Sequence, residues 1–226
     1  MHWLGYYYIQ DPVSVLPVEA LQLEKGEQVL DLCAAPGGKG LYMGQLLGNE
    51  GTVVANEPDG KRRQVLQSNI QRLGAANLVL TAYDGRVVPE GEKFSAILVD
   101  APCSGEGAQR YPEEPPDVET KSQHQDLAER QYGLLEKAYR ILEPGGRVVY
   151  STCTYNPLEN EAVVTRLLQN TGARMVDVDF DYPHGHGVRE WENHQFHPEV
   201  EMIWRCYPHH YNGGGMAFAL LEKPED

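Results

Sequence analysis

Short apolar runs alternate with longer amphipathic stretches along most of this chain, and no other feature limits its fold as strongly. Three runs have the length and composition of buried strands: 28–32 (QVLDL), 52–56 and 96–100 (AILVD). Helical patterns lie between or after them, over about 39–47, 61–73 and 123–142. Strands that alternate with helices build parallel sheets, because each helix carries the chain back across the sheet. We therefore predict an α/β fold with a mostly parallel sheet and helices on both faces.

Further elements complete the predicted sheet. Strands are expected at 78–82, 147–151, 174–178 and 216–221, which makes seven, and another helix at 158–169. The helix over 61–73 should end at Gly74, since glycine readily adopts the left-handed conformation that follows a helix. The prolines of 111–117 (YPEEPPD) remove amide donors, so this tract is expected to be a loop. The segment rich in His and aromatic residues between the last two strands is expected to be mostly loop.

Size and composition fit one intracellular domain. The chain has 226 residues, 41% of them hydrophobic, which is enough for a single core without disulfides or metals. No apolar run approaches the roughly 18 residues that span a bilayer, and the N-terminus lacks the pattern of a signal peptide. The four cysteines form no C-x-x-C pair, which disfavours a disulfide framework or a zinc cage. We expect a cytoplasmic protein with reduced thiols.

Residues suited to ligand binding follow the first two predicted strands. In an open parallel sheet, ligands bind beyond the carboxyl ends of the strands. Residues 31–39 (DLCAAPGGK) combine glycines, which allow close backbone approach, with amides at a helix start, which can receive an anionic group. The P-loop pattern is absent. Glu57 ends the second strand, where an acidic residue commonly binds the ribose hydroxyls, so an unphosphorylated nucleoside is indicated.

Two carboxyl groups and two thiols follow the next strands. Asp84 comes after the third strand, Asp100 and Cys103 after the fourth, and Cys153 after the fifth. Because the fourth and fifth strands are expected to be neighbours, both thiols can face one pocket. A single free cysteine is more often a small buried hydrophobe. Both of these lie at strand ends, which favours a functional pair.

Two other groups of residues invite a functional interpretation. The histidines of 184–186, 194–197 and 209–210 have spacings that match no metal-ligand pattern, so no metal is expected. Trp3 and the tyrosines at 6–8 can stack on a flipped base or nucleoside, but packing against the sheet is equally plausible.

Several segments together resemble one known family: 5–12 (GYYYIQDP), 31–39 (DLCAAPGGK), 55–57 (ANE), 100–107 (DAPCSGEG) and 150–161 (YSTCTYNPLENE). The chain resembles the Sun-type S-adenosylmethionine-dependent RNA (cytosine-5) methyltransferases, and among them the bacterial 16S ribosomal RNA methyltransferase F-like branch. Other Rossmann-like methyltransferases do not carry both thiol motifs. The resemblance implies a Rossmann-like class I methyltransferase fold, a single catalytic domain over 1–226, and S-adenosylmethionine as the cofactor.

The resemblance also implies roles for individual residues. The expected cofactor-binding residues are Cys33, Ala34, Ala35, Pro36, Gly37, Gly38, Lys39, Glu57, Arg62, Asp84 and Asp100. Among these, Glu57 would hold the ribose hydroxyls and Asp84 the adenine edge. Asp100, which is also an expected catalytic residue, would lie between cofactor and base, where it is placed to stabilise the charge that develops on the ring near N3. Cys153 would be the nucleophile that adds to C6 of the cytosine, and Cys103 would help to release the product.

RNA is the expected partner, with ribosomal RNA favoured by the branch and tRNA as the alternative. A net charge of −14 opposes RNA binding by this chain alone, because phosphate contacts require Lys and Arg. The run 61–63 (KRR) and Arg110 are local candidates, although the run fits a solvated helix face equally well. The family's flanking RNA-binding modules are expected to be absent. Either the chain is a catalytic core cut from a longer protein, or an RNA-binding partner or a ribosomal particle supplies affinity.

Some positions depart from the family pattern, and other functions stay open. Gly40 stands where the family usually has Thr or Ser, and 108–111 (AQRY) replaces Met-Phe-Arg-Lys. One alternative is a non-catalytic S-adenosylmethionine-binding factor in RNA processing or ribosome assembly. Another is a small-molecule or DNA methyltransferase. The DNA enzymes place the nucleophile in the P-C motif, so the roles of Cys103 and Cys153 distinguish the two chemistries.

Overall fold

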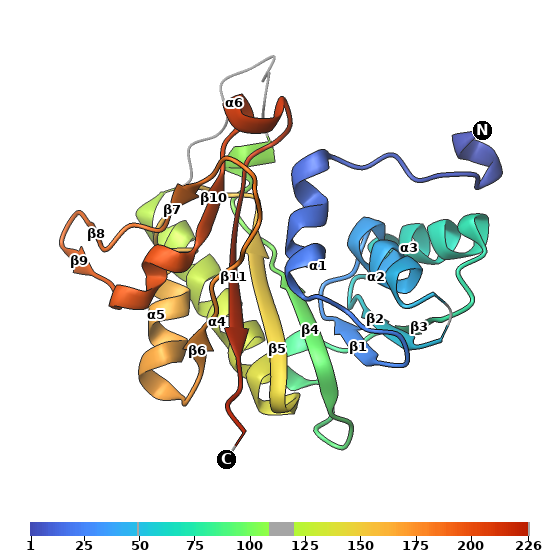
Figure 1. Ribbon diagram of the computed structural model, residues 1–226, viewed down its shortest axis with the longest axis horizontal. Coiled ribbons are helices and arrows are strands. Elements are labelled where there is room, and N and C mark those ends of the chain that lie inside the picture. The colour runs from blue at the N-terminus through green and yellow to red at the C-terminus, as the bar shows by residue number, and fades with distance from the viewer. Residues whose placement is uncertain (49, 109–119, 226) are drawn as a thin grey trace.

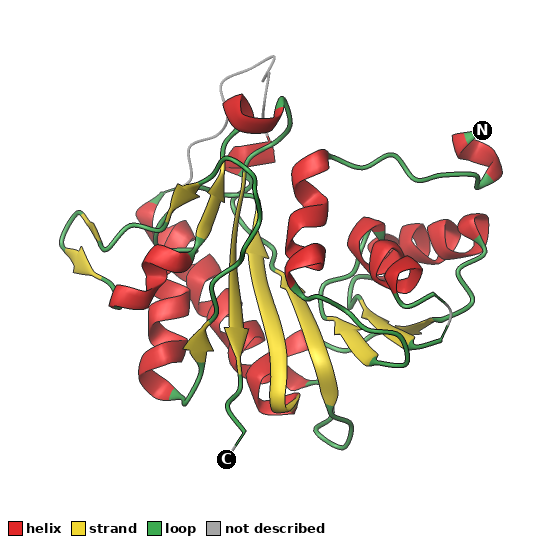
Figure 2. Ribbon diagram, in the orientation of Figure 1, coloured by secondary structure: helices red, strands yellow, loops and turns green. Residues whose placement is uncertain are grey.

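A nine-stranded sheet runs through the part of the protein that the structure describes, with helices on both of its faces (Figures 1 and 2). The structure is a computed structural model, and it describes residues 1–48, 50–108 and 120–225. The strands follow the order β3-β2-β1-β4-β5-β11-β10-β7, and β6 pairs with β11 beside this path. The expected loop at 111–117 and the candidate Arg110 lie outside the described residues.

Five parallel strands form one half of the sheet. They are β1 (Gln28–Asp31), β2 (Thr52–Asn56), β3 (Leu78–Thr81), β4 (Phe94–Asp100) and β5 (Leu142–Thr152). This half confirms the predicted α/β fold and the predicted positions of its strands. The fifth strand begins earlier than expected, because residues 142–146 already run alongside the start of β4.

The other half of the sheet is antiparallel and larger than predicted. Its strands are β11 (Met216–Glu222), β10 (Trp204–Cys206), β7 (Gly185–His186) and β6 (Arg174–Met175). The expected seventh strand is β11, and the expected sixth is β6, which keeps only two residues. The prediction of seven strands is therefore wrong by two, because β7 and β10 lie in the segment expected to be mostly loop. Strands of two or three residues are too short to show an alternating pattern.

The helices cover both faces of the sheet. They are α1 (Leu16–Ala20), α2 (Gly38–Leu46), α3 (Gly60–Leu73), α4 (Lys121–Ile141), α5 (Glu161–Asn170) and the short α6 (Pro208–Tyr211). Gly74 follows α3 with φ 66°, as predicted. A capping box between Thr120 and Gln123 starts α4, two residues before the expected position. The helix expected from 158 begins at Glu161 instead, because residues 157–160 form a turn.

Short elements join these helices and strands. Five 3₁₀ turns are present in the described chain: η1 (His2–Leu4), η2 (Pro12–Val15), η3 (Gly85–Val87), η4 (Glu106–Ala108) and η5 (Pro198–Met202). A separate hairpin pairs β8 (Glu190–Trp191) with β9 (His194–Gln195). Across 1–48, 50–108 and 120–225, no helix has the length and apolar character needed to cross a membrane.

Strand β4 shows how the two hydrophobic cores are built. Ala96 and Leu98 belong to the cluster that includes residues of α1 and α2, whereas Ile97 and Val99 belong to the cluster that includes residues of α4 and α5. Alternate residues of a strand point to opposite faces, so an almost continuous apolar run is what a doubly covered strand requires. This rigid centre leaves the carboxyl ends of β1, β2, β4 and β5 free to carry polar side chains.

Candidate active site

Most of the predicted site residues gather at the carboxyl ends of the parallel strands. Two adjoining cavities lie there, and Cys33 lines both. The first, which we call the β1 pocket, has a volume of about 240 Å³. It is lined by Tyr8, Ile9, Gln10, Asp11, Ser14, Asp31, Cys33, Ala34, Ala35, Pro36, Gly38, Lys39 and Asp100. The second, the Glu57 pocket, is lined by Leu32, Cys33, Glu57, Pro58, Arg62, Asp84, Gly85, Pro102, Arg130 and Leu134.

The glycine-rich loop wraps tightly around the start of α2. Gly37 precedes the helix with φ 115°, a backbone conformation that residues with a side chain rarely adopt. A Cβ atom on Gly38 would lie 3.1 Å from the ring of Tyr8 and 3.2 Å from Oε1 of Gln10. These glycines therefore let the N-terminal segment pack directly on the loop that borders the β1 pocket.

Glu57 is held in place at the end of β2. Its side chain is 2% exposed, and Oε1 accepts a hydrogen bond of 2.9 Å from the backbone N–H of Asp59. Arg62 lies 3.5 Å from Oε2 and also donates to the carbonyl of Ala35 at 2.8 Å. Arg62 thus links the glycine-rich loop to Glu57. The next arginine of the run, Arg63, donates to the carbonyls of Glu57 and Pro58, so these two arginines brace the loops of the site.

Asp31 is an unusual group in the β1 pocket. It is 1% exposed, and neither carboxyl oxygen has a hydrogen-bond partner among the described residues. Burial, followed by the nearby charge of Asp100, raises the pKa of Asp31 to about 7, although Lys39 opposes the shift. Gly40 contributes to this isolation, because a Cβ atom there would lie 3.0 Å from Oδ2 of Asp31. A hydroxyl side chain at position 40 would meet this carboxyl group, and glycine supplies none.

Lys39 and Asp100 form an ion pair at the border between the β1 pocket and the thiols. Lys39 Nζ lies 2.8 Å from Asp100 Oδ2, and the hydroxyl of Ser151 donates to Asp100 Oδ1 at 2.8 Å. Burial is the largest single effect and lowers the pKa of Lys39, but the charge of Asp100, the hydrogen bond to it and the charge of Asp31 together outweigh burial, so the pKa is raised. Asp100 and Ser151 are register partners on the neighbouring strands β4 and β5. Both oxygens of Asp100 therefore act as acceptors.

The two thiols meet, as the strand order predicted. Cys103 Sγ lies 3.3 Å from Cys153 Sγ, and both side chains are partly buried. The hydrogen bond from Cys103 lowers the pKa of Cys153, against the effects of burial and of Asp100, and Lys39 assists. The same contact, together with burial, raises the pKa of Cys103. Because a thiolate is the reactive form, Cys153 is the better nucleophile of the pair.

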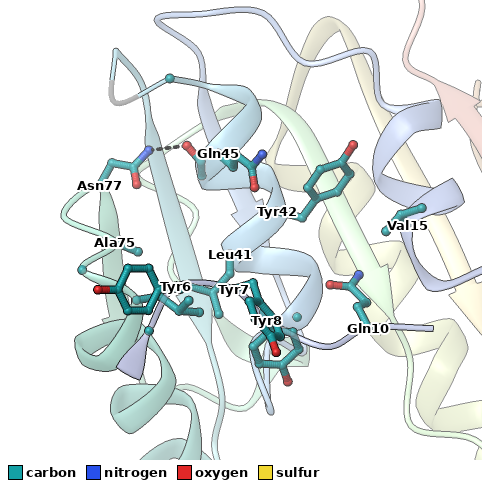
Figure 3. Close-up of a pocket in the computed structure, with 16 residues that line it drawn as sticks. Tyr6, Tyr7, Tyr8, Gln10, Val15, Leu41, Tyr42, Gln45, Ala75 and Asn77 are labelled. Carbon is teal, nitrogen blue, oxygen red and sulfur yellow. Dashed lines mark hydrogen bonds between the residues drawn. The ribbon is translucent and has the colours of Figure 1, made fainter. Parts of the chain in front are cut away.

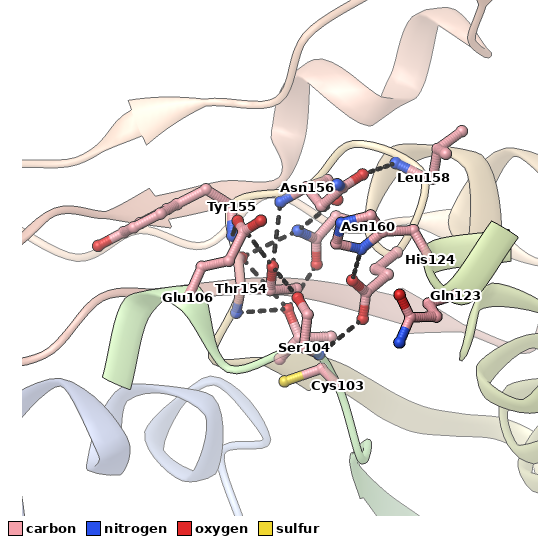
Figure 4. A network of polar contacts seen from close by, with 12 residues as sticks. Cys103, Ser104, Glu106, Gln123, His124, Thr154, Tyr155, Asn156, Leu158 and Asn160 are labelled. Atoms are coloured by element: carbon pink, nitrogen blue, oxygen red, sulfur yellow. Dashed lines mark hydrogen bonds and ion pairs between the residues drawn. The ribbon is translucent and has the colours of Figure 1, made fainter. Parts of the chain in front are cut away.

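A network of polar side chains surrounds the turns that carry the thiols (Figure 4). The residues that follow the two cysteines bond to each other, since Ser104 Oγ donates to Thr154 Oγ1 at 2.8 Å. Thr154 donates in turn to Glu106 at 3.1 Å. The side-chain amide of Asn160 donates to the carbonyls of Thr154 and Asn156 at 3.1 Å each. These contacts fix the position of one thiol relative to the other.

A buried ion pair lies on the Cys153 side of this network. Glu161, which is 0% exposed, accepts three hydrogen bonds from Arg205, at 2.6, 2.7 and 2.9 Å. Arg205 also donates to the carbonyl of Tyr155 at 2.9 Å, close to the Cys153 turn. Sequence reasoning gave no role to Arg205, or to Glu159, Gln131 and His124, which lie under the Cys103 turn. The residues of each contacting pair are far apart in the chain, so no local spacing in the sequence predicts their contact.

Asp84 reaches the Glu57 pocket, but Arg86 occupies its carboxyl group. Arg86 donates to Oδ1 at 3.0 Å and to Oδ2 at 2.6 Å. These hydrogen bonds lower the pKa of Asp84 to about 2. An ionised Asp84 at the rim of this pocket is therefore an acceptor already engaged by three donors of one residue, the backbone N–H and the guanidinium of Arg86.

The N-terminal tyrosines line a separate groove of about 600 Å³ between the first residues, α2 and the end of α3 (Figure 3). Tyr6 is 72% exposed and Trp3 is 85% exposed, so packing against the sheet is wrong for these two rings. Tyr8 is partly buried, and of the three tyrosines it alone also lines the β1 pocket.

The histidines pack mainly against aromatic rings. His184 stacks on Trp204 with 3.6 Å between ring centroids, and His209 stacks on Tyr207 at 5.7 Å. Within the described ranges, no three His, Cys, Asp or Glu side chains are grouped so that they could hold a metal ion.

Comparisons with known sequences identify a family model and curated relatives. A family model described as "16S rRNA methyltransferase RsmB/F" matches residues 18–222. The human 28S rRNA (cytosine(4447)-C(5))-methyltransferase is 36% identical over 227 aligned residues, which cover 97% of this chain and 28% of that protein. The ribosomal RNA small subunit methyltransferase F of Vibrio campbellii is 44% identical over 229 aligned residues, which cover 98% of this chain and 46% of that protein. The chain thus spans less than half the length of these relatives.

Solved structures with the same fold include two proteins from Pyrococcus horikoshii. A structure described as NSun6 with SFG superposes with a TM-score of 0.86 at 30% identity, and covers all of this chain and 55% of that one. A methyltransferase homolog protein superposes with a TM-score of 0.85 at 32% identity, and covers 98% of this chain and 69% of that one. These similarities confirm the predicted class I methyltransferase fold.

Proposed function

The chain belongs to the 16S rRNA methyltransferase RsmB/F family, and we propose that it transfers a methyl group from S-adenosylmethionine to C5 of a cytosine in RNA. Ribosomal RNA is the favoured substrate, because the curated relatives act on ribosomal RNA. The observation that carries the proposal is the pair of thiols, Cys103 and Cys153, with sulfur atoms 3.3 Å apart beside the Lys39–Asp100 ion pair.

The β1 pocket and the Glu57 pocket border the positions that we assign to the two ends of S-adenosylmethionine, and the Glu57 pocket, with a volume of about 20 Å³, must widen to admit the adenosine end. The buried carboxyl group of Asp31, which lacks a partner among the described residues, suits the ammonium group of the methionine end. Residues 33–39 would surround this end of the cofactor, and Glu57 would accept hydrogen bonds from the ribose hydroxyls. The adenine would lie between Asp84 and the apolar side chains of the Glu57 pocket. A related structure was solved with SFG, an S-adenosylmethionine analogue, which supports this assignment.

Cys153 supplies the nucleophile. C5 of cytosine is too weakly nucleophilic to attack the sulfonium-bound methyl group that the cofactor provides. Addition of the Cys153 thiolate to C6 forms an S–C bond and turns the ring into an enamine-like nucleophile at C5. The hydrogen bond from Cys103 favours the required thiolate.

Lys39 and Asp100 act on the cytosine ring. Both oxygens of Asp100 accept hydrogen bonds, from Lys39 and Ser151. Asp100 would also accept a hydrogen bond from the exocyclic amino group of cytosine. Lys39 is the neighbouring donor that can stabilise the negative charge that develops on the ring.

Cys103 completes the reaction. After methyl transfer the C5 proton must leave, so that the C6–S bond breaks and Cys153 is released as a thiolate. Cys103, acting directly or through water, is our candidate for the base, once the cytosine separates the two thiols. The target base must first leave its stack, which costs a few kcal/mol unless it is already unpaired.

RNA affinity must come mainly from contacts other than a strongly basic surface. The net charge is −14, and Arg62 and Arg63 are engaged with backbone carbonyls of the site. Since phosphate contacts dominate RNA affinity, we propose that a partner or a ribosomal particle helps residues 1–226 to bind RNA.

The function is tested by methyl transfer from labelled S-adenosylmethionine. Unmodified ribosomal RNA, small ribosomal subunits and tRNA are offered in parallel, and the product is digested to nucleosides. We expect labelled 5-methylcytidine, most strongly with ribosomal RNA or subunits. Labelling of tRNA alone would correct the substrate. Cofactor binding without any labelled nucleoside would favour a non-catalytic RNA-processing or assembly factor.

A further inference from the structure

A fully buried carboxylate lies under the turn that carries Cys103. Glu159 is 0% exposed, and its Oε2 accepts hydrogen bonds from the backbone N–H of Ser104 at 3.1 Å and from Gln131 Nε2 at 2.8 Å. Its other oxygen, Oε1, lies 2.7 Å from Nδ1 of His124. A carboxylate in such surroundings is stable only when its partners satisfy it, so this geometry is strongly specified.

Glu159 and Gln131 together hold the Cys103 turn on both sides of the cysteine. Gln131 Nε2 also donates to the carbonyl of Pro102 at 2.9 Å, while Glu159 binds the amide of Ser104. The residues immediately before and after Cys103 are therefore fixed by two side chains from other elements. We call this pair of side chains the Glu159–Gln131 clamp.

The Glu159–Gln131 clamp also influences how the thiol of Cys103 is placed relative to that of Cys153. Ser104, whose amide binds Glu159, donates through its hydroxyl to Thr154, the residue after Cys153. A shift of the Cys103 turn would therefore alter its alignment with the Cys153 turn. Because the base that removes a proton must lie within hydrogen-bonding reach, such a shift would affect the step assigned to Cys103.

We propose that Glu159 and Gln131 are positioning residues that hold Cys103 in place for product release. This inference rests on the proposed function, and it assigns neither residue a contact with RNA or cofactor. Glu159 presents an acceptor oxygen to Ser104 and Gln131 and a second oxygen to His124. In Glu159→Gln one of these two positions becomes an amide nitrogen, which either faces the two donors or replaces the oxygen beside His124.

The neighbouring Glu161 provides a matched control. It is also 0% exposed, but it pairs with Arg205 and accepts from the amide of Val188, away from the Cys103 turn. Glu159→Gln and Glu161→Gln make the same chemical change at two buried carboxylates two residues apart. Only the first should act through Cys103.

The experiment compares wild type, Glu159→Gln, Gln131→Met and Glu161→Gln in single turnovers with methyl-labelled S-adenosylmethionine and RNA. Methyl transfer and decay of the covalent RNA–protein complex are followed separately. We expect decay to slow by about ten- to a hundredfold in Glu159→Gln and Gln131→Met, with methyl transfer and cofactor affinity changed by less than about threefold. Glu161→Gln should show normal decay per folded molecule. Gln131→Met, which leaves the carboxylate in place, guards against a folding defect in Glu159→Gln.

A readout without RNA separates this inference from the proposed function. The alkylation rate of Cys103 by iodoacetamide, with Cys153 replaced by alanine and added glutathione as the reference, should change in both clamp variants and not in Glu161→Gln. If wild type methylates no RNA, the function fails, while alkylation still tests the clamp. Normal complex decay with normal Cys103 alkylation in both clamp variants would overturn the inference, as would an equal loss of transfer and decay in all three variants.

Discussion

The sulfur atoms of Cys103 and Cys153 lie 3.3 Å apart, although the two residues are 50 positions apart in the chain. Either sulfur can donate in this contact, and with Cys103 as the donor the hydrogen bond lowers the pKa of Cys153. In Cys103→Ala the pKa of Cys153 should therefore rise, and its alkylation at pH 7 should slow. The pH dependence of iodoacetamide labelling, read by mass spectrometry at Cys153, measures this. An unchanged midpoint would show that Cys103 does not activate Cys153.

Asp31 predicts how cofactor binding depends on pH. Its pKa in the ligand-free protein is about 7, and a cationic group beside it would favour the ionised form. Binding of S-adenosylmethionine should therefore release a proton near and below pH 7, and affinity should rise as the pH increases toward that value. Calorimetry in two buffers of different ionisation enthalpy measures the release. Asp31→Asn should abolish it, and equal release in this variant would contradict the assignment.

Glu57 is expected to bind the ribose through its buried carboxylate. Glu57→Gln keeps the shape but removes the charge, so S-adenosylmethionine should bind about ten- to a hundredfold more weakly. The matched control is Glu50→Gln, since Glu50 forms only an exposed ion pair with Lys25. Titration calorimetry measures the affinity of both variants for S-adenosylmethionine. Equal affinities in wild type and Glu57→Gln would remove Glu57 from the cofactor site.

The Glu161–Arg205 pair is expected to be important for stability. Removing one member of a buried ion pair leaves the other charge uncompensated, so Glu161→Gln should lower the free energy of unfolding by about 3–5 kcal/mol. The exposed pair of Arg166 and Glu129 offers a control, because Glu129→Gln should lower it by less than about 1 kcal/mol. Urea unfolding of the three proteins measures both values. Similar losses of unfolding free energy in the two variants would mean that the buried Glu161–Arg205 pair stabilises the protein no more than an exposed pair does.

The sequence predicted the parts of the site that depend on strand order alone. Strand β2 lies at the predicted residues 52–56, because its apolar run follows Gly51 and ends at polar residues. The meeting of Cys103 and Cys153 followed from placing both at the ends of neighbouring strands. Glu57 and Lys39 were also found where glycine-rich loops and strand ends predicted them.

Contacts between distant segments could not be predicted in the same way. Glu159 meets Gln131 and His124 across 28 and 35 residues, and Arg205 meets Glu161 across 44. Such pairs depend on how α4, α5 and β10 pack, and helical or strand periodicity carries no information about them. The lack of a hydrogen-bond partner for the Asp31 carboxyl group likewise could not be predicted, because it depends on Gly40 lying beside that group in the folded protein.

Trapping of the covalent complex is the most direct test of the central claim that Cys153 attacks the cytosine and Cys103 releases the product. Wild type, Cys103→Ala and Cys153→Ala are incubated with RNA and S-adenosylmethionine, and complexes are separated on denaturing gels. We expect a stable RNA–protein complex with Cys103→Ala, and neither complex nor 5-methylcytidine with Cys153→Ala, which should still bind the cofactor. A complex that persists in Cys153→Ala and is lost in Cys103→Ala would contradict the account and exchange the roles of the two thiols.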